Sequence, residues 1–252
     1  MNKLSKFART CIVLAFWVVI WGLVAVWVDK EVLVSSPVDV LKRLLELLQT
    51  AEFYTIVLYS ICRIVAGFMV AVMAGILFGV LCAKMPLMDE VISPLLSLIK
   101  ATPVASFIIL ALVWLDKQMI PSFISFLMVF PIIQSNVCAG FKNTPIELIE
   151  MTRVYHFNFV HKITKLYIPS IMPYFLAGFK TSLGLAWKAG VAAEVLCFPK
   201  NSIGKELYEA KTYLQTIDVF TWSITIVIIS IVIEKVLIWS VEKILTKRKM
   251  VD

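Results

Sequence analysis

Long blocks of apolar residues, separated by short charged segments, form the dominant pattern along the 252-residue chain. Runs such as Cys11 to Val28 and Ile224 to Ile233 are apolar on every side. A helix crosses about 30 Å of hydrocarbon with roughly 20 such residues, whereas a membrane β-barrel shows strands of about ten residues with alternating polarity. The pattern therefore predicts an all-α polytopic membrane protein. We expect about six transmembrane helices, near residues 10–28, 55–83, 94–115, 119–141, 168–196 and 219–242.

Composition agrees with a bilayer as the main solvent, because 60% of the residues are hydrophobic, only 16% are charged and the mean hydropathy is +0.91. The net charge of +7 does not indicate nucleic acid, since the basic residues lie at the ends of apolar blocks and no soluble basic domain exists. More lysines and arginines fall on the side of the termini than on the other side. The positive-inside rule then predicts that both termini are cytoplasmic. We expect a single transmembrane domain over residues 1–252.

Two short amphipathic helices are predicted on the outer surface. Ser36 and Pro37 begin the first, from Val38 to Thr50, where leucines recur at helical spacing beside charged residues. The second extends from Asn201 to Tyr213 and has a less apolar face. Both lie between predicted spans, so we expect them to rest at the membrane surface.

The longest polar interruption, from Lys142 to Ile168, predicts a helix, a turn and a second helix outside the membrane. Thr144, Pro145 and Glu147 have the spacing of a capping box with proline at the first helical position, so a helix should begin there and end near Tyr155. The second helix should begin at Asn158 and end near Pro169. We expect Val154, Tyr155, Phe157 and Phe159 to be exposed, and therefore either to fold back on the chain's own spans or to dock on a partner.

Two predicted spans carry ridges of small residues at four-residue spacing: Gly67, Ala71, Gly75 and Gly79 in one, and Gly178, Ser182, Ala186 and Gly190 in the other. Small residues let helices approach closely in a membrane. Tight packing inside one bundle is one interpretation of these ridges. A path between helices is the other.

The interruption resembles the cytoplasmic motif of permease subunits of type I ABC importers, which reads Glu-Ala-Ala, three residues, Gly, nine residues, Ile-x-Leu-Pro. Here Glu150 opens the motif, Met151 and Thr152 replace the alanines, His156 occupies the glycine position, and Leu166 to Pro169 closes it. Pro94 to Pro103, Gly184 to Leu196 and Ser202-Ile203-Gly204 are similar to the branch of sulfonate, taurine, nitrate and thiamine-precursor permeases. The resemblance covers nearly the whole chain.

The resemblance implies a cytoplasmic coupling helix between spans four and five, over about residues 143–168, that sits in a groove of an ATPase subunit. It implies contact or hinge roles for Glu150, Arg153, Val154, Tyr155 and His156, and a return to the membrane through Leu166, Ile168 and Pro169. The family's glycine suits a left-handed backbone at the helix end. Histidine visits that region more readily than most residues, so we expect the turn to survive at His156.

Several charges fall within predicted spans, where each costs roughly 2.5–3.5 kcal/mol at mid-depth. Lys188 and Glu194 are six positions apart and point about 120° away from each other on a straight helix, so they cannot pair. Arg63 is one candidate partner for Glu194. Structural ion pairing is one interpretation of these charges. The other is that Arg63, Lys100, Lys188 and Glu194 line or gate a translocation path.

The sequence thus predicts the permease subunit of an ABC importer in the bacterial cytoplasmic (inner) membrane. Its expected partners are two copies of an ABC ATPase, a second permease copy or a homologue, and an extracytoplasmic solute-binding protein. A scaffold component of an energy-coupling-factor transporter and an intramembrane enzyme are the alternatives. No GxSxG, HExxH or P-loop pattern occurs. We therefore expect no catalytic residues, no metal and no cofactor in this chain, and ATP hydrolysis by the partner subunit.

Overall fold

The computed structural model describes residues 3–30 and 32–249, and within them every regular element is helical. Side chains are described from residue 8 onward, apart from residues 31, 242 and 244–252. The elements in chain order are α1 (Lys3–Val28), α2 (Pro37–Leu47), α3 (Ala51–Lys84), α4 (Pro86–Ala101), α5 (Val104–Trp114), α6 (Ile120–Lys142), α7 (Ile146–Val154), α8 (Phe159–His161), the π-helical turn η1 (Lys162–Tyr167), α9 (Ile168–Cys197), α10 (Ile203–Thr212) and α11 (Thr216–Lys249). The predicted all-helical class is confirmed.

Four of the described helices are long and apolar enough to cross a membrane: α1 from Ala8, α3, α6, and α11 as far as Val241. The pair α4 and α5 makes five if the two count as one broken span. Helix α9 is 30 residues long but is not among them, and it carries Lys180, Lys188 and Glu194. A multi-pass membrane protein is therefore shown, whereas the predicted number of six spans stays a prediction.

The single span expected at residues 94–115 is wrong in its shape, because α4 and α5 meet at an angle of 106°. Pro103 explains the break, since a proline disfavours helical backbone in the residue before it. Thr102 is accordingly extended, with φ −83° and ψ 130°, and its hydroxyl donates to the carbonyl of Leu98 at 2.8 Å. Helix α4 thus ends with its last turn capped by its own threonine.

The core is formed by α3, α6 and α9, with α6 between the other two. The ridge of α3 lies on α6 so closely that a Cβ at Gly67 would stand 2.0 Å from the carbonyl oxygen of Ser122. Cβ atoms at Gly178 and Gly190 would meet Asn136 of α6 and Ile64 of α3, at 2.9 and 2.6 Å. The packing interpretation of both ridges is therefore confirmed at these glycines, which are buried inside the chain.

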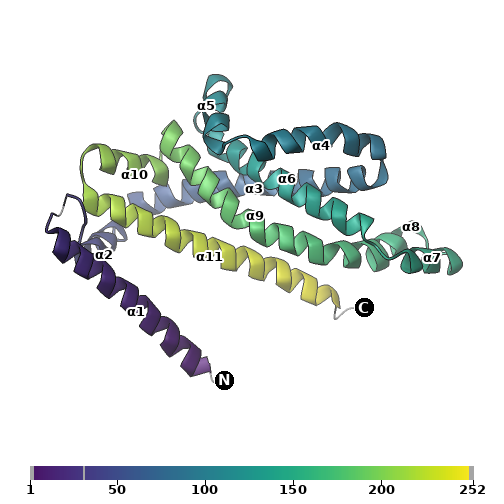
Figure 1. Ribbon diagram of the computed structural model, residues 1–252, viewed down its shortest axis with the longest axis horizontal. Coiled ribbons are helices and arrows are strands. Elements are labelled where there is room, and N and C mark those ends of the chain that lie inside the picture. Colours follow the sequence, from purple (N-terminus) through teal and green to yellow (C-terminus); the bar gives the residue numbers. More distant parts are fainter. Residues whose placement is uncertain (1–2, 31, 250–252) are drawn as a thin grey trace.

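Apart from α5, the short helices lie at two opposite ends of the bundle (Figure 1). Helices α2 and α10 lie at one end, where α1 finishes and α11 starts, and α7 and α8 lie at the other. Helix α1 stands apart from the bundle, and in its span no residue is buried. Both predicted amphipathic helices form, and Ser36 caps α2 by accepting hydrogen bonds from the backbone N–H groups of Val38 and Asp39 at 3.2 and 3.4 Å.

Candidate functional site

Helix α7 projects from one end of the molecule (Figure 1), and large apolar side chains at its end and in the following α8 are exposed. Val154 is 73% exposed, Tyr155 70%, Phe159 70% and Val160 63%. Glu150, Arg153 and His156 are also exposed on this tip. The interpretation that these apolar residues fold back on the chain's own spans is therefore wrong. Phe157 is a partial exception, because it is half-buried and its ring meets that of His161 edge to face at 6.1 Å.

His156 ends α7 with a left-handed backbone, at φ 50°. The N–H of His156 donates to the carbonyl of Arg153 at 3.1 Å, and the N–H of Phe157 donates to that of Thr152 at 3.0 Å. These two bonds form a Schellman motif, which satisfies carbonyls at the end of the helix. The predicted left-handed turn at His156 is thus confirmed.

The start of α7 and the return to the bundle both differ from prediction. No capping box forms, because the hydroxyl of Thr144 donates back to the carbonyl of Gly140 in α6 at 3.4 Å and Pro145 precedes the first helical residue without a side-chain cap. The second helix does not end near Pro169. It begins at Asn158 as predicted, whose side chain accepts from the N–H of His161 at 2.8 Å, and it continues through η1 into α9.

A π-helical turn makes this continuity possible. Pro169 has no N–H, so in this continuous segment a backbone carbonyl in the preceding turn goes without its usual helical donor. The wider turn over residues 162–167 absorbs the irregularity just before it. Leu166 is buried there at 4% exposure, and Ile168 is half-buried. The exposed tip is therefore joined to the bundle by one uninterrupted helical segment.

A second cluster lies toward the opposite end, around Glu194. Its side chain is fully buried, and one oxygen accepts from the guanidinium of Arg63 at 3.0 Å. The other oxygen accepts from the hydroxyl of Ser60 at 2.9 Å and from the N–H of Gly204 at 3.2 Å. Arg63 also donates to the backbone carbonyls of Lys200 and Asn201. The structure thus brings Arg63 to Glu194, as the sequence suggested, and α3, α9 and α10 meet at this pair.

Sequence reasoning missed the other members of this cluster. Ser60 links the carboxylate to α10, because its oxygen also accepts from the N–H of Ile203 at 3.0 Å. Gly204 lies so close that a Cβ there would stand 2.5 Å from the Cβ of Glu194. The run Ser202-Ile203-Gly204 was the available signal, and Ser60 offered none. We call Ser60, Arg63, Glu194 and Gly204 the latch.

Lys100 in α4 and Lys188 in α9 differ from the latch because both are exposed. We call the exposed surface of α4, α6 and α9 the open face. The ammonium of Lys100 donates to the hydroxyl of Ser135 in α6 at 3.0 Å. Lys188 is exposed and has no hydrogen bond or ion pair to another described side chain. The structure therefore separates the four predicted path residues into a buried pair and two exposed lysines.

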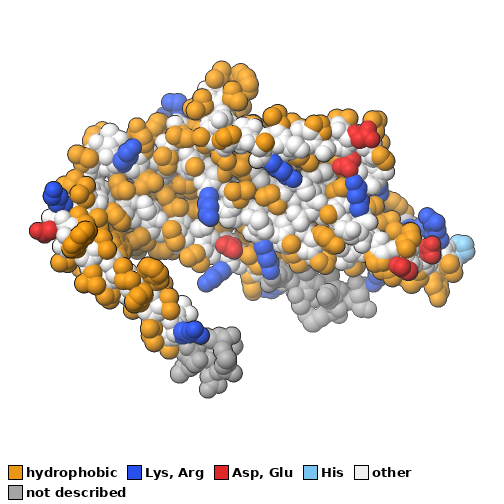
Figure 2. Space-filling model, viewed as in Figure 1, with side chains coloured by type: hydrophobic (Ala, Val, Ile, Leu, Met, Phe, Trp, Pro, Cys, Tyr) orange, Lys and Arg blue, Asp and Glu red, His pale blue; other side chains and the backbone are white. Residues whose placement is uncertain are grey.

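The open face differs from a surface made for lipid. Along α9 the small or polar residues Ala177, Thr181, Gly184 and Ala192 stand at helical spacing from Lys188, and the larger Tyr174 and Leu185 beside them are only 37% and 38% exposed. Helix α11, in contrast, exposes large aliphatic and aromatic side chains such as Val227, Val236 and Trp239. Figure 2 shows blue side chains scattered over this view, with a red side chain among them near the middle and most of the other red ones toward the α7 end.

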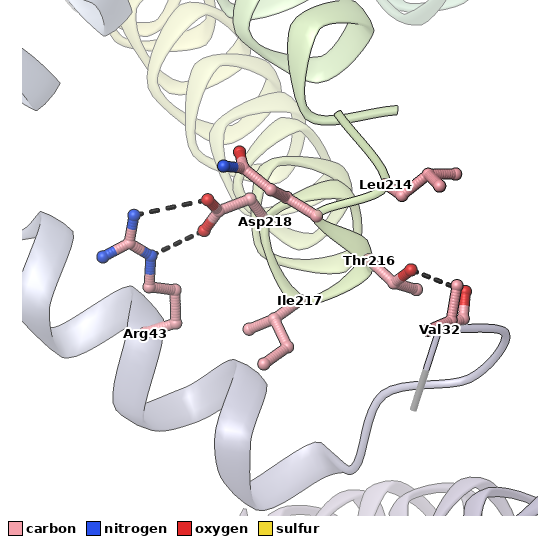
Figure 3. Close-up of a pocket in the computed structure, with 7 residues that line it drawn as sticks. Val32, Arg43, Leu214, Thr216, Ile217 and Asp218 are labelled. Atoms are coloured by element: carbon pink, nitrogen blue, oxygen red, sulfur yellow. Dashed lines mark hydrogen bonds and ion pairs between the residues drawn. The ribbon is translucent and has the colours of Figure 1, made fainter. Parts of the chain in front are cut away.

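At the end of the bundle away from α7, the short helix α2 is tied to α11 by an ion pair that the sequence did not predict (Figure 3). The guanidinium of Arg43 donates to both carboxylate oxygens of Asp218, at 2.6 and 3.3 Å. The hydroxyl of Thr216 donates to the carbonyl of Val32 at 2.6 Å. A small cavity of about 360 Å³ lies between these groups. The two contacts hold α2 and the loop after α1 against the start of α11.

Comparison with known proteins gives a consistent result. The family described as binding-protein-dependent transport system inner membrane component matches residues 75–249. The putative aliphatic sulfonates transport permease protein SsuC of Bacillus subtilis is 26% identical over 83% of this chain and 75% of its own. A putative ABC transporter permease protein of Methanocaldococcus jannaschii is 27% identical over 94% and 90%. The nitrate import permease protein NrtB of Leptolyngbya laminosa is 30% identical over 54% and 50%.

Proposed function

Because the chain belongs to the family of binding-protein-dependent transport system inner membrane components, we propose that it is the permease subunit of a type I ABC importer. In this proposal it forms the path for a small solute that an extracytoplasmic binding protein delivers. A separate ATPase subunit, present in two copies, hydrolyses ATP. The chain itself is a single domain that crosses the inner membrane six times, with cytoplasmic termini, and it binds no metal or cofactor.

The observation that carries the proposal is the exposed apolar tip. Val154 and Tyr155 stand in water at the end of a helix that is held rigidly by the Schellman turn at His156. A cluster of large apolar side chains on a water-exposed surface usually marks a site of protein interaction. The cluster on the tip is therefore suited to a groove of a partner protein. We therefore assign α7 and the residues up to Pro169 as the coupling helix that docks on the ATPase.

The open face supports the second part of the proposal. A lysine that faces lipid in mid-membrane is costly. A second copy of the chain across this face would enclose a water-filled path lined by Lys100 and Lys188. The latch stands apart from that path, because Glu194 is fully buried and both its oxygens are occupied. We assign it to holding α10 on the bundle.

Matched tyrosines at the two ends test the docking assignment. Tyr155 on the tip and Tyr213 at the end of α10 are 70% and 71% exposed. Because the two side chains are equally exposed, glutamate should change the free energy of folding by a similar small amount at either position. We expect Tyr155→Glu, Val154→Glu and Glu150→Arg to stay in the membrane but to lose the copurifying ATPase. Tyr213→Glu should keep it.

The variants are compared by two measurements: the ratio of ATPase to permease after purification, and ATP-driven uptake by membrane vesicles. If Tyr155→Glu retains the ATPase as well as Tyr213→Glu does, the assignment of α7 as the coupling helix is refuted.

A further inference from the structure

An apolar groove of about 400 Å³ lies between α3, α6, η1 and α9, at the end of the bundle from which α7 projects (Figure 1). Val80 of α3, Phe141 of α6 and Phe175 of α9 are among its eleven lining residues. Ten of the eleven are apolar or aromatic, and the eleventh is Lys84. The groove therefore offers an almost entirely hydrocarbon-like surface with one cation.

The groove begins at the depth where a lipid headgroup would lie. Lys84 is the last residue of the span α3, and the neighbouring span α6 ends in Lys142 at the same end of the bundle. Lysines at the ends of spans extend to the interface between hydrocarbon and water. From Lys84 the lining continues along α3 to Ile76, eight residues or about 12 Å deeper in the span. The groove thus leads from the headgroup region into the hydrocarbon.

Lys84 has no acidic partner in the described part of the chain. Its ammonium lies over the rings of Phe141 and Phe159, at 5.8 and 5.9 Å from their centroids, and it makes no hydrogen bond or ion pair to a described residue. Lys142, in contrast, is neutralised by Asp89 at 2.6 Å. Ring contacts leave the three N–H donors of an ammonium without an acceptor. The groove therefore ends in an exposed cation that is held in place and can still bind an anion.

An anionic phospholipid matches both parts of this groove. An acyl chain suits the apolar lining, and a phosphate can accept hydrogen bonds from the ammonium of Lys84. Basic pockets between spans bind anionic headgroups, and η1, which forms one side of the groove, carries two further lysines and no acid. An extended segment of a partner protein fits less well, because its backbone N–H and C=O groups would find no hydrogen-bonding partners on this lining.

We propose that this groove is a binding site for one anionic phospholipid of the surrounding bilayer, with an acyl chain along α3 and α9 and the phosphate at Lys84. Such a site requires only that α3 and α6 span the membrane, so it is independent of the ATPase and of the transported solute. Because Ile163 and Tyr167 of η1 line the groove, a bound lipid also packs against the segment that joins the tip to α9.

Lipid binding to the full chain tests this site directly. The chain is purified in a nonionic detergent and titrated with dioleoylphosphatidylglycerol, which is anionic, or with dioleoylphosphatidylcholine, which has the same acyl chains and no net charge. Native mass spectrometry gives the dissociation constant of the first lipid that is retained. Lys211→Met is the matched control for Lys84→Met, because Lys211 is also exposed and also lies over a ring, that of Tyr208 at 5.7 Å.

We expect the chain to prefer phosphatidylglycerol, and Lys84→Met to weaken the binding of that lipid about fivefold without changing the binding of phosphatidylcholine. A fivefold loss corresponds to about 1 kcal/mol, the contribution of one lysine near a membrane surface. Lys84→Arg and Lys211→Met should both bind phosphatidylglycerol as the unmodified chain does. Ile76→Trp, which places a bulky ring in the groove, should weaken both lipids. Val227→Trp, at an exposed position of α11 outside the groove, should weaken neither.

Three results would overturn the site. Equal affinity of the unmodified chain for the two lipids would mean that the headgroup is not recognised. Equal losses in Lys84→Met and Lys211→Met would mean that phosphatidylglycerol is attracted to basic surfaces in general. If Ile76→Trp binds both lipids as well as Val227→Trp does, the acyl chain lies elsewhere. Because Lys84 and Lys211 are both exposed, their comparison decides the outcome even if a tryptophan variant does not fold.

Discussion

Replacing Glu194 by glutamine tests whether the latch holds the fold or gates transport. All of the partners of this carboxylate are donors: the Arg63 guanidinium, the Ser60 hydroxyl and the Gly204 N–H. Glutamine turns one acceptor oxygen into an NH₂ group. Whichever way the amide is turned, that group faces a donor, so at least one buried hydrogen bond is lost and one donor is left unsatisfied.

The expected cost of this substitution follows from the contacts. A hydrogen bond to a charged group contributes about 1.5–3 kcal/mol, and an unsatisfied buried donor costs about 1–3 kcal/mol. We therefore expect Glu194→Gln to lower the free energy of unfolding by about 3 kcal/mol. For a chain of this size, that corresponds to a fall in melting temperature of roughly 6–12 °C. Arg63→Met should cost about 3–5 kcal/mol, because it leaves a buried carboxylate without its cation.

Thermal unfolding of the purified complex, followed by tryptophan fluorescence, provides the assay. Glu209→Gln is a matched control, since Glu209 pairs with Lys205 at 3.3 Å on the half-exposed side of α10. An exposed pair contributes about 0–1 kcal/mol. The double variant Arg63→Met/Glu194→Gln should lose less than the sum of its single variants, because each loss already includes the broken pair.

A gating role makes the opposite prediction. Melting near that of the unmodified protein, together with loss of the stimulation of ATPase activity by the binding protein, would refute the latch. Normal melting and normal stimulation in Glu194→Gln would refute both roles.

Two further predictions concern the tip and α10. His156→Gly should keep ATPase coupling and His156→Val should impair it, since a β-branched residue at φ 50° costs about 1–2 kcal/mol; equal ATP-driven uptake by the two variants would contradict the left-handed turn. Burial raises the pKa of Glu206 above its ordinary value of 4.5, so the folded protein binds this proton more tightly than the unfolded chain. Stability should then fall as the pH rises through the window that begins near 4.5, and Glu206→Gln should flatten that slope in melting curves recorded between about pH 4 and pH 8.

The helical class and most helix positions could be predicted from the sequence because apolar blocks of this length have one stable form in lipid. The turn at His156 was expected from the resemblance to the family motif, in which His156 occupies the position of a glycine. The break at Pro103 was predictable in principle, since Thr102 precedes a proline. The apolar block from Pro94 to Leu115 concealed the break, because the average hydropathy of a segment is the same whether its helix is straight or bent.

Tertiary contacts account for what could not be predicted. Thr144 has the spacing of a helix cap, but Gly140 of the preceding helix offers its hydroxyl an acceptor first. Pro169 does not end a helix, because the backbone widens into a π-helical turn just before it and so accommodates a residue without an N–H. Ser60 lies 134 positions from Glu194, and no local pattern reports contacts at that separation. Exposure separated Lys100 and Lys188 from the buried pair, and exposure is a property of the folded chain.

The uninterrupted segment from Phe159 to Cys197 has a mechanical consequence. At 1.5 Å per residue it is roughly 58 Å long, with the exposed tip at one end and Glu194 one turn from the other. If such a rod pivots at one end, a tilt of about 5° displaces the far end by about 5 Å, close to one helical turn. In the proposed transporter, a push on the tip would therefore reach the end near Glu194 as a displacement of about one helical turn.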